Sequence, residues 1–150
     1  MSFLNDVVNI VIKYYPNLLD GVGNTMLIAL IGTVAGLVIG LLTGVVRTAP
    51  LSKNAVLRVL HKILNAVIAV YVEIFRGTPM MVQLLIMSMV IFANSRNFTM
   101  VGALTLGINS GAYVAEIVRS GIMSIDQGQT EAGLVLGMTK SQNFFKITLM

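Results

Sequence analysis

Long uninterrupted runs of apolar residues dominate this chain and alternate with short clusters of charge. Three runs lack any charged residue: 21–46, 77–95 and 97–115. A helix needs roughly 20 mainly apolar residues to cross a bilayer, with a range of about 17–25. The pattern therefore predicts three membrane-spanning helices. These spans are expected at about 22–46, 78–95 and 98–118.

A fourth apolar stretch, "AVLRVLHKILNAVIAVYVEIF" at 55–75, has a mixed character. Its second half is uniformly apolar over 66–72, whereas its first half places four polar residues on one helical face. These are Arg58, His61, Lys62 and Asn65. A basic polar face of this kind is typical of a helix that lies in the membrane interface. A short additional span is the alternative interpretation.

The distribution of basic residues favours the interfacial interpretation. If 55–75 lies flat, only Lys13 and Arg96 face one side of the membrane, and eight basic residues share the other. These eight are Arg47, Lys53, Arg58, Lys62, Arg76, Arg119, Lys140 and Lys146. Basic residues gather on the cytoplasmic side of membrane proteins. We therefore expect residues 1–20 to form an external N-terminal segment and the C-terminal segment to be cytoplasmic.

The stretch "FRGTPMMVQ" predicts a break between helices. Gly77 allows the chain to turn, Thr78 can cap free backbone amides, and Pro79 suits the first position of a helix. One helix should therefore end near Phe75 and the next should start at Thr78. A proline kink within one long helix is the alternative.

Composition supports a membrane protein and excludes several kinds of chemistry. Hydrophobic residues make up 56% of the chain and charged residues only 11%, whereas soluble domains carry about 25% charged residues. The chain has no cysteine, which excludes disulfides and thiolate chemistry. No catalytic or metal-ligating set is evident, and we expect His61 to be solvated or to lie among lipid headgroups. The predicted class is an all-α membrane protein that is not an enzyme and holds no cofactor of its own.

Glycines recur at every fourth position in the first predicted span. They are Gly32, Gly36, Gly40 and Gly44. Such a ladder lets another helix backbone approach closely in lipid. Packing against the other helices of the same chain is the expected role, and dimerisation through this face is the alternative.

The C-terminal stretch, about 121–150, predicts a helix, a sharp turn and a second helix. A short helix is expected over 131–136, and Gly137 can adopt the left-handed conformation that ends it. Thr139 and Gln142 have the spacing of a capping box, so a second helix should begin there. Leu134, Val135 and Met138 would give the bend an apolar edge, which indicates a docking surface for a partner.

Polar residues within the predicted spans are candidates for a substrate path. Asn109, Tyr113 and Glu116 share one helical face, and Gln83 lies in the preceding span. Polar residues in spans usually face the interior of a bundle or a water-filled path. A structural hydrogen-bond network, with Glu116 paired to Arg119 or Arg76, is the competing explanation.

Four motifs carry a resemblance to a known family. The segments "LLDGVGNTMLIAL" (18–30), "YVEIFRGTPMMVQLL" (71–85) and "GAYVAEIVRSGIMSIDQGQTEAG" (111–133) resemble the polar-amino-acid branch of the inner-membrane permeases of binding-protein-dependent ABC importers. The signature loop of that family matches a fourth set of positions. These are Glu131, Ala132, Gly133, Gly137, Ile147 and Leu149. Gly133 stands where the family has a second alanine, and Met150 stands where it has a proline.

The resemblance implies a fold, a function and partners. It implies the front part of a five-span permease domain over 21–150, because family members have two further spans after the signature loop. That loop forms coupling helices that dock on a cytoplasmic ATPase, which binds the ATP. The other implied partners are a second permease subunit, alike or different, and an extracytoplasmic solute-binding protein, all at the bacterial inner membrane.

Two functions remain open at this point. One is the permease subunit of an ATP-driven importer for a polar amino acid. The other is a truncated membrane scaffold, or a fragment of such a permease, that does not transport. Genes for an ATPase and a binding protein beside this one would favour the importer.

Overall fold

The computed structural model describes residues 2–49 and 54–148, and all regular structure in these ranges is helical. The elements follow one another along the chain as helices α1 to α6, with two π-helical segments. They are α1 (Ser2–Thr48), α2 (Ala55–Gly77), α3 (Met80–Ile86), η1 (Met87–Ile91), α4 (Phe98–Met123), α5 (Gln127–Val135), α6 (Lys140–Asn143) and η2 (Phe144–Thr148). The predicted all-α class is confirmed.

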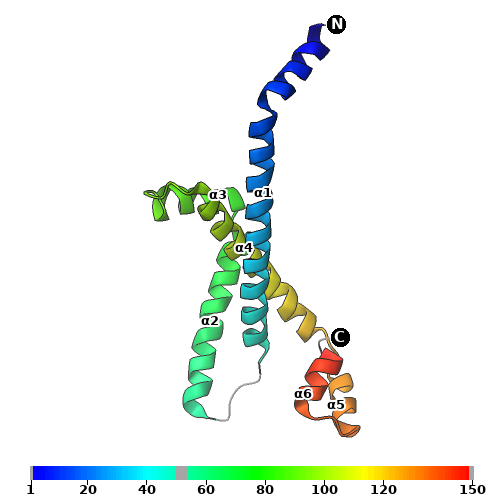
Figure 1. Cartoon of the computed structure of the whole chain (residues 1–150). Helices are drawn as coiled ribbons and strands as arrows, with labels where there is room; N and C mark the ends of the chain where they lie inside the picture. Colours follow the sequence, from blue (N-terminus) through cyan, green and yellow to red (C-terminus); the bar gives the residue numbers. More distant parts are fainter. Residues whose placement is uncertain (1, 50–53, 149–150) are drawn as a thin grey trace.

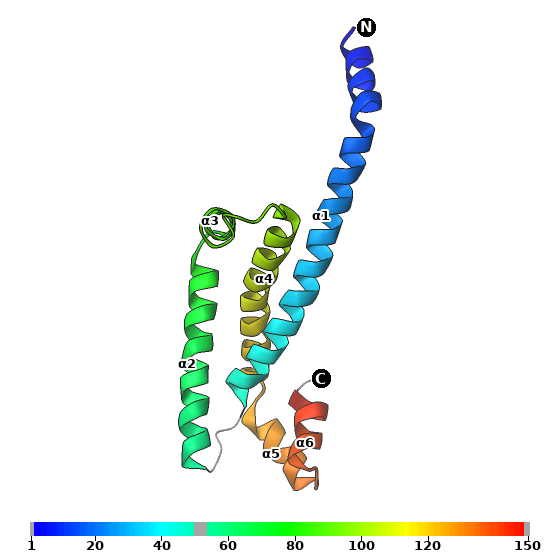
Figure 2. The ribbon, with the colours of Figure 1, turned by 60° about the vertical axis from the view of Figure 1, so that its left-hand side comes forward.

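Three helices form the body of the molecule, and a small helical unit lies at one end of it. Figures 1 and 2 show α1 and α4 side by side, with α2 next to α4 and α3 lying across the end of α2. The unit of α5 and α6 follows α4 at the end opposite to the start of α1 (Figure 1). Three helices among the described residues are long and apolar enough to cross a membrane: α1, α2 and α4.

The number of candidate spans agrees with the prediction, but one of them falls on a different stretch of the chain. The stretch 55–75 belongs to α2, a 23-residue helix that can span. The stretch 78–95 contains only a shorter apolar helix, Met80–Ile91. At 1.5 Å per residue those residues cover about 18 Å, less than the roughly 30 Å hydrocarbon core. An uncharged run of sequence is therefore not the same as a helix of that length.

The polar face of α2 explains why the sequence pattern suggests an interfacial helix. His61 and Asn65 are half-buried, and the same helical stripe continues as the buried Ile68 and Val72. Ile68 and Val72 pack in one cluster with two alanines of α4, Ala112 and Ala115. His61 and Asn65 thus belong to the protein-facing side of α2, whereas Arg58 and Lys62 of the same predicted polar face are exposed.

The glycine ladder of α1 packs against α4, as the intramolecular interpretation predicts. Gly32, Gly36, Gly40 and Gly44 are all buried, and their neighbours on α4 are Leu106, Ser110, Val114 and Val118. We call these eight residues the glycine seam. A Cβ atom added at Gly36 would lie 2.6 Å from the Cβ of Ser110 and 3.2 Å from the backbone nitrogen of Gly111. The face is occupied by α4, so it does not serve a dimer.

Gly111 of α4 lies where all three long helices meet. A Cβ atom at this position would lie 2.9 Å from Ile39 of α1 and 2.9 Å from the hydroxyl of Tyr71 of α2. That hydroxyl donates a hydrogen bond to the carbonyl oxygen of Ile108 (2.5 Å). The side chain of Tyr71 therefore ties α2 to α4 at a point where only glycine leaves room for it.

The predicted break between α2 and α3 is present, with different capping. The side chain of Thr78 is not an N-cap: its hydroxyl donates back to the carbonyl oxygen of Ile74 (2.8 Å) and so closes the end of α2. Pro79 itself is the N-cap residue of α3, without a side-chain hydrogen bond. The alternative, a single kinked helix, is excluded because Thr78 and Pro79 have extended backbone angles.

Candidate functional site: a capped helical bend and a charged span

The bend between α5 and α6 has hydrogen bonds that fix the ends of both helices. Helix α5 begins at Gln127, four residues before the predicted start at Glu131, because the side chain of Asp126 caps it. The carboxylate of Asp126 accepts a hydrogen bond from the backbone N–H of Gly128 (2.6 Å). Aspartate is among the best N-cap residues, since its oxygen satisfies an otherwise free amide.

The end of α5 has the hydrogen bonds of a Schellman motif. The N–H of Met138 donates to the carbonyl of Gly133 (3.1 Å), and the N–H of Gly137 donates to the carbonyl of Leu134 (3.0 Å). Gly137 has φ of +82°, the left-handed conformation that this motif requires and that other residues avoid. The predicted conformation of Gly137 is confirmed.

The predicted capping box opens α6. The hydroxyl of Thr139 accepts from the N–H of Gln142 (3.3 Å), and the side-chain oxygen of Gln142 accepts from the N–H of Thr139 (3.0 Å). These two bonds satisfy two free amides reciprocally. The bend is therefore closed on both sides, by a Schellman motif before it and a capping box after it.

Asn143 fastens the two arms of the bend to each other. Its side chain is 2% exposed, and its amide nitrogen donates to the carbonyl oxygen of Thr130 on α5 (2.5 Å). Gly133 faces the same contact: a Cβ there would lie 2.6 Å from the terminal methyl of Ile147 and 3.0 Å from the side-chain oxygen of Asn143. Glycine at 133 thus allows α5 to approach η2 closely.

The tip of the bend presents apolar side chains to the outside. Val135 is 86% exposed and Leu136 is 80% exposed, and Leu134 is exposed as well. Phe145 of η2, beyond the tip, is also exposed. Met138, which the sequence assigns to the same edge, is half-buried. Of the other signature-loop residues, Glu131 and Ala132 are exposed and Ile147 is half-buried. Leu149 lies outside the described residues.

Two of the four path candidates meet in a buried hydrogen-bond network. The side-chain nitrogen of Asn109 donates to the side-chain oxygen of Gln83 (2.9 Å). Gln83 in turn donates to the carbonyl oxygen of Phe75 (2.8 Å) and to the hydroxyl of Thr78 (2.7 Å). Both amides are buried, and together they satisfy the carbonyl end of α2. This is the structural network that competes with a path role.

The other two candidates, Tyr113 and Glu116, lie in a charged cluster. The Glu116 carboxylate lies 3.0 Å from Arg47 of α1 and 2.6 Å from Arg119. It also lies 3.9 Å from Arg76 of α2. The predicted partners Arg119 and Arg76 are both present, and Arg47 adds a third. One carboxylate thus faces three guanidinium groups, and the side chain of Arg76 also covers the half-exposed ring of Tyr113 at 5.6 Å.

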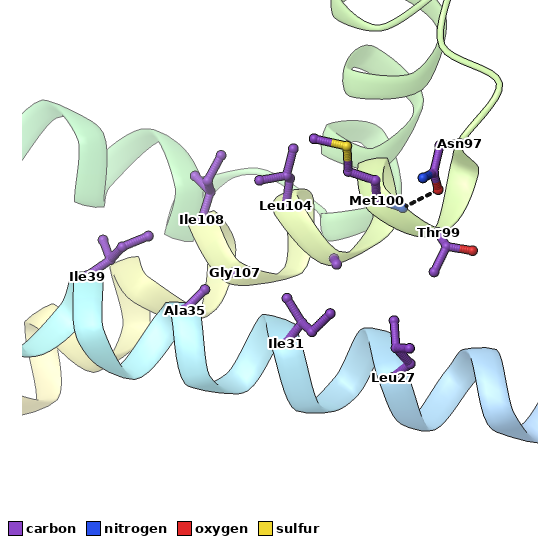
Figure 3. A pocket seen from close by; sticks show the side chains of 11 residues that line it. Leu27, Ile31, Ala35, Ile39, Asn97, Thr99, Met100, Leu104, Gly107 and Ile108 are labelled. Atoms are coloured by element: carbon purple, nitrogen blue, oxygen red, sulfur yellow. Dashed lines mark hydrogen bonds between the residues drawn. The ribbon is translucent and has the colours of Figure 1, made fainter.

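A cavity of about 300 Å³ lies between α1 and α4. Unlike the amide network and the charged cluster, it is lined mainly by apolar residues. Figure 3 shows Ile31, Ala35 and Ile39 of α1 facing Leu104, Gly107 and Ile108 of α4 across it. Asn97 lies at its edge, where its side chain caps α4 through the N–H of Met100 (3.0 Å). The lining residues carry no charge, so this cavity suits an apolar occupant and does not suit a polar solute.

The fold and the site together define a class: a multi-pass membrane protein with a rigid helical bend at one end of its spans. Residues 36–149 match the model of the family described as "Binding-protein-dependent transport system inner membrane component". The chain belongs to this family of inner-membrane components of ABC importers, as the sequence motifs predict.

Individual members of the family are similar in sequence to most of this chain. The glutamine transport system permease protein GlnP of Escherichia coli (strain K12) is 39% identical over 129 residues, which are 83% of this chain and 54% of that protein. A relative from Rickettsia prowazekii (strain Madrid E), named as a putative glutamine transport system permease protein, is 38% identical over 138 residues, 86% of this chain and 57% of that protein. This chain thus spans little more than half the length of these relatives.

The structural comparison agrees with the sequence comparison. A solved structure, described as "Crystal structure of an amino acid ABC transporter with histidines", matches with a TM-score of 0.66 and 32% identity. The match covers 92% of this chain and 61% of that one. The fold of the described residues is therefore that of an amino acid ABC transporter permease.

Sequence reasoning misses two residues of the site. Asn143 gives no signal in the sequence, because an asparagine in a short helix is usually exposed. The sequence marks Arg47 only as an indicator of topology, although it ends the long helix that packs on α4. Its pairing with Glu116 follows from the close approach at Gly40 and Gly44, which places the last turn of α1 beside α4.

Proposed function

We propose that this chain forms a transmembrane permease subunit of an ATP-driven importer for a polar amino acid. In this function the substrate arrives on an extracytoplasmic binding protein, and a second permease subunit completes the path. Support comes from family membership and from relatives whose names state glutamine transport. The solved structural neighbour is an amino acid transporter, which favours the same substrate class.

The observation that carries the proposal is the capped bend between α5 and α6. Its backbone is fixed by the Schellman motif and the capping box, while Val135 and Leu136 at its tip make little contact with the rest of the described chain. A rigid unit that exposes large apolar side chains is suited to dock into a groove of a partner. The partner proposed for this surface is the cytoplasmic ATPase.

The bend and most of the basic residues lie at the same end of the molecule, which indicates how the protein is oriented in the membrane. The last turn of α1, the start of α2 and the end of α4 lie at the same end of the body as α5 and α6 (Figure 1). Basic side chains are concentrated there. The described ones are Arg47, Arg58, Lys62, Arg119 and Lys146. By the positive-inside rule this end is cytoplasmic, and Lys13 and Arg96 lie toward the outside. Arg76, predicted on the cytoplasmic side, lies in the last turn of α2, at the opposite end of that helix from Arg58.

The proposed path-lining residues fall into two groups with different tasks. Asn109 and Gln83 use their polar atoms on each other and on the end of α2, so they hold the wall of the path in shape. Tyr113 and Glu116 are more accessible, and the arginines around Glu116 leave this region with excess positive charge. That charge suits the carboxylate end of an amino acid.

In this proposal the chain performs no bond chemistry and holds no cofactor. The described residues contain no group of three or more His, Asp or Glu side chains placed to hold a metal ion. ATP binding and hydrolysis belong to the ATPase subunit. The signature-loop residues transmit its movement to the spans, and Glu131, Ala132, Gly133, Gly137 and Ile147 are the proposed coupling residues.

The experiment is uptake by the assembled importer in vesicles. The complex containing this chain, the second permease subunit, the ATPase and the binding protein should accumulate labelled glutamine only when ATP is supplied on the cytoplasmic face. An excess of another polar amino acid should compete more strongly than an excess of leucine. ATPase binding without any uptake of amino acids would instead support the non-transporting scaffold.

A further inference from the structure

The first part of α1 has a helical pattern that nothing in the transport function uses. Between residues 3 and 24, every asparagine, aspartate and lysine falls on one helical stripe. The stripe consists of Asn5, Asp6, Asn9, Lys13, Asn17, Asp20 and Asn24. At 100° per residue these positions cover about a third of the helix circumference.

The remaining circumference of this segment is apolar and bulky. Between residues 3 and 19, every position outside the polar stripe carries an aliphatic or aromatic side chain, with one exception. The exception is Pro16, which lies on the polar side of the helix. These side chains are Phe3, Leu4, Val7, Val8, Ile10, Val11, Ile12, Tyr14, Tyr15, Leu18 and Leu19. All of them are exposed, and the described chain buries no residue from 3 to 27. The broad apolar face therefore has no partner among the described residues.

The amphipathic pattern stops where the membrane-spanning pattern begins. Beyond Asn24 the polar stripe is continued by Leu27, Ile31 and Val34, so the helix becomes apolar all round. Contact with α4 begins in this second part, at Ile28 and Gly32. Helices that are apolar on one face lie in the interface, whereas helices that are apolar all round cross the membrane.

The length of α1 requires a second location for its first part. The helix has 47 residues, which correspond to about 70 Å at 1.5 Å per residue, against a hydrocarbon core of about 30 Å. Residues 21–46 already fill the core. The preceding turns must therefore lie either in water or along the membrane surface, and their wide apolar face is unfavourable in water.

The position of Pro16 on α1 favours a bend of the helix toward its apolar face. It belongs to the polar side of the helix, between Lys13 and Asn17. A proline ring clashes with the carbonyl group four residues before it, which opens the helix on the proline side and bends it toward the opposite face. The opposite face here is apolar. Figure 1 shows the axis of α1 changing direction in this part of the helix.

We propose that residues 3–20 form an interfacial helix that lies on the membrane surface at the N-terminal end of the span. Its apolar face enters the lipid, its polar stripe faces water, and α1 bends toward its apolar face at Pro16 before it enters the bilayer. Tyr14 and Tyr15 belong to the apolar face, and tyrosine rings collect at the boundary between membrane and water. The occupant of the apolar face is lipid, because that face continues without a charged residue into the exposed side of the span.

The test uses the absence of tryptophan from this chain. Val11→Trp places a probe on the apolar face, and Asn9→Trp places one on the polar stripe about 3 Å away along the axis. The whole protein is reconstituted in vesicles of phosphatidylethanolamine and phosphatidylglycerol with brominated acyl chains. Leu42→Trp, at an exposed position of the span, is the reference for a lipid-facing probe.

Each probe has a definite expected result. The fluorescence of Val11→Trp should be quenched severalfold more by brominated lipid than that of Asn9→Trp, and aqueous iodide should show the reverse order. Quenching of both by iodide and of neither by bromine would mean that the segment stands in water. Protection of Val11→Trp from both quenchers would mean that a protein covers the face. Bromine quenching of both would mean that the segment is inserted. Each of these three results overturns the proposal.

Discussion

The glycine seam and the capped bend both bring two helical segments into close contact at glycines, but the bend depends in addition on capping and side-chain hydrogen bonds. In the seam, side chains are removed, and Gly32 to Gly44 let the backbone of α1 lie against α4. In the bend, specific polar bonds are added, from Asp126, Thr139, Gln142 and Asn143. The seam lies within lipid and the bend lies at the aqueous end of the molecule. The different contacts of the two regions follow from these different surroundings.

Within lipid, apolar side chains gain nothing by leaving their surroundings, so tight packing of small residues holds helices together. At the aqueous end, short helices are marginal and their ends expose free amides, so capping bonds are needed. The seam should therefore be sensitive to added volume and tolerant of polarity. The bend should be sensitive to lost hydrogen bonds and tolerant of changes in side-chain size at its exposed tip.

The largest effect is expected from added volume in the seam. Gly40→Leu places a side chain on Val114 and puts its Cβ 3.0 Å from the backbone nitrogen of Ala115, which cannot move away as a side chain would. Overpacking of this kind costs about 1–3 kcal/mol or more. Thermal aggregation of the detergent-solubilised protein, followed by size-exclusion chromatography, should begin at a markedly lower temperature.

A matched control separates volume from composition. Gly23→Leu makes the same change in the same helix, at a glycine whose added Cβ would meet no atom within 4 Å. Its thermal stability should equal that of the unmodified protein. Equal losses in Gly40→Leu and Gly23→Leu would mean that close approach of α1 and α4 does not govern stability.

The next effect concerns the bond that joins the two arms of the bend. Asn143→Ala removes the hydrogen bond to Thr130 and leaves a carbonyl without that donor. Loss of a buried hydrogen bond of this kind costs about 1–3 kcal/mol. Limited proteolysis should cut the α5–α6 unit faster, while the spans remain folded. Gln129→Ala, at an exposed position of α5, is the control and should leave the cleavage rate unchanged.

A smaller effect is expected from the capping box. Thr139→Ala removes the hydroxyl that accepts from Gln142, which costs about 1 kcal/mol for a typical N-cap. Amide hydrogen exchange should rise at the start of α6 and stay unchanged in α4. Thr139→Ser keeps the acceptor and should behave as the unmodified protein. Equal exchange in both variants would show that the box contributes nothing.

The same contrast explains how much of this molecule can be predicted from sequence. The bend is predictable, because the spacing of Thr139 and Gln142 and the presence of Gly137 act over a few residues. The role of the seam follows from the spacing of its glycines. The sequence does not show the burial of Asn143, which depends on how α5 and η2 fold back on each other.

One candidate span differs from the predicted stretch for a related reason. Absence of charge over 77–95 does not measure the length of a helix, and the helix there ends at Ile91. The polar residues of α2 suggest an interface, although His61 and Asn65 lie on the stripe that packs against α4 farther along. For α2, the side that faces protein is decided by tertiary packing, and its sequence pattern does not reveal that side.

The most direct test of the central claim, that the bend couples the spans to an ATPase, is one substitution in the assembled importer. Gly137→Val forces a β-branched residue into a left-handed backbone, which costs roughly 1–2 kcal/mol or more. Gly121→Val is the matched control, because its surroundings are equally open and its backbone is helical. We predict normal membrane insertion for both variants. Gly137→Val should lose ATPase co-purification or ATP-driven uptake, and Gly121→Val should keep both. Full association and full uptake with Gly137→Val would show that the bend is only a connector, which would contradict the account.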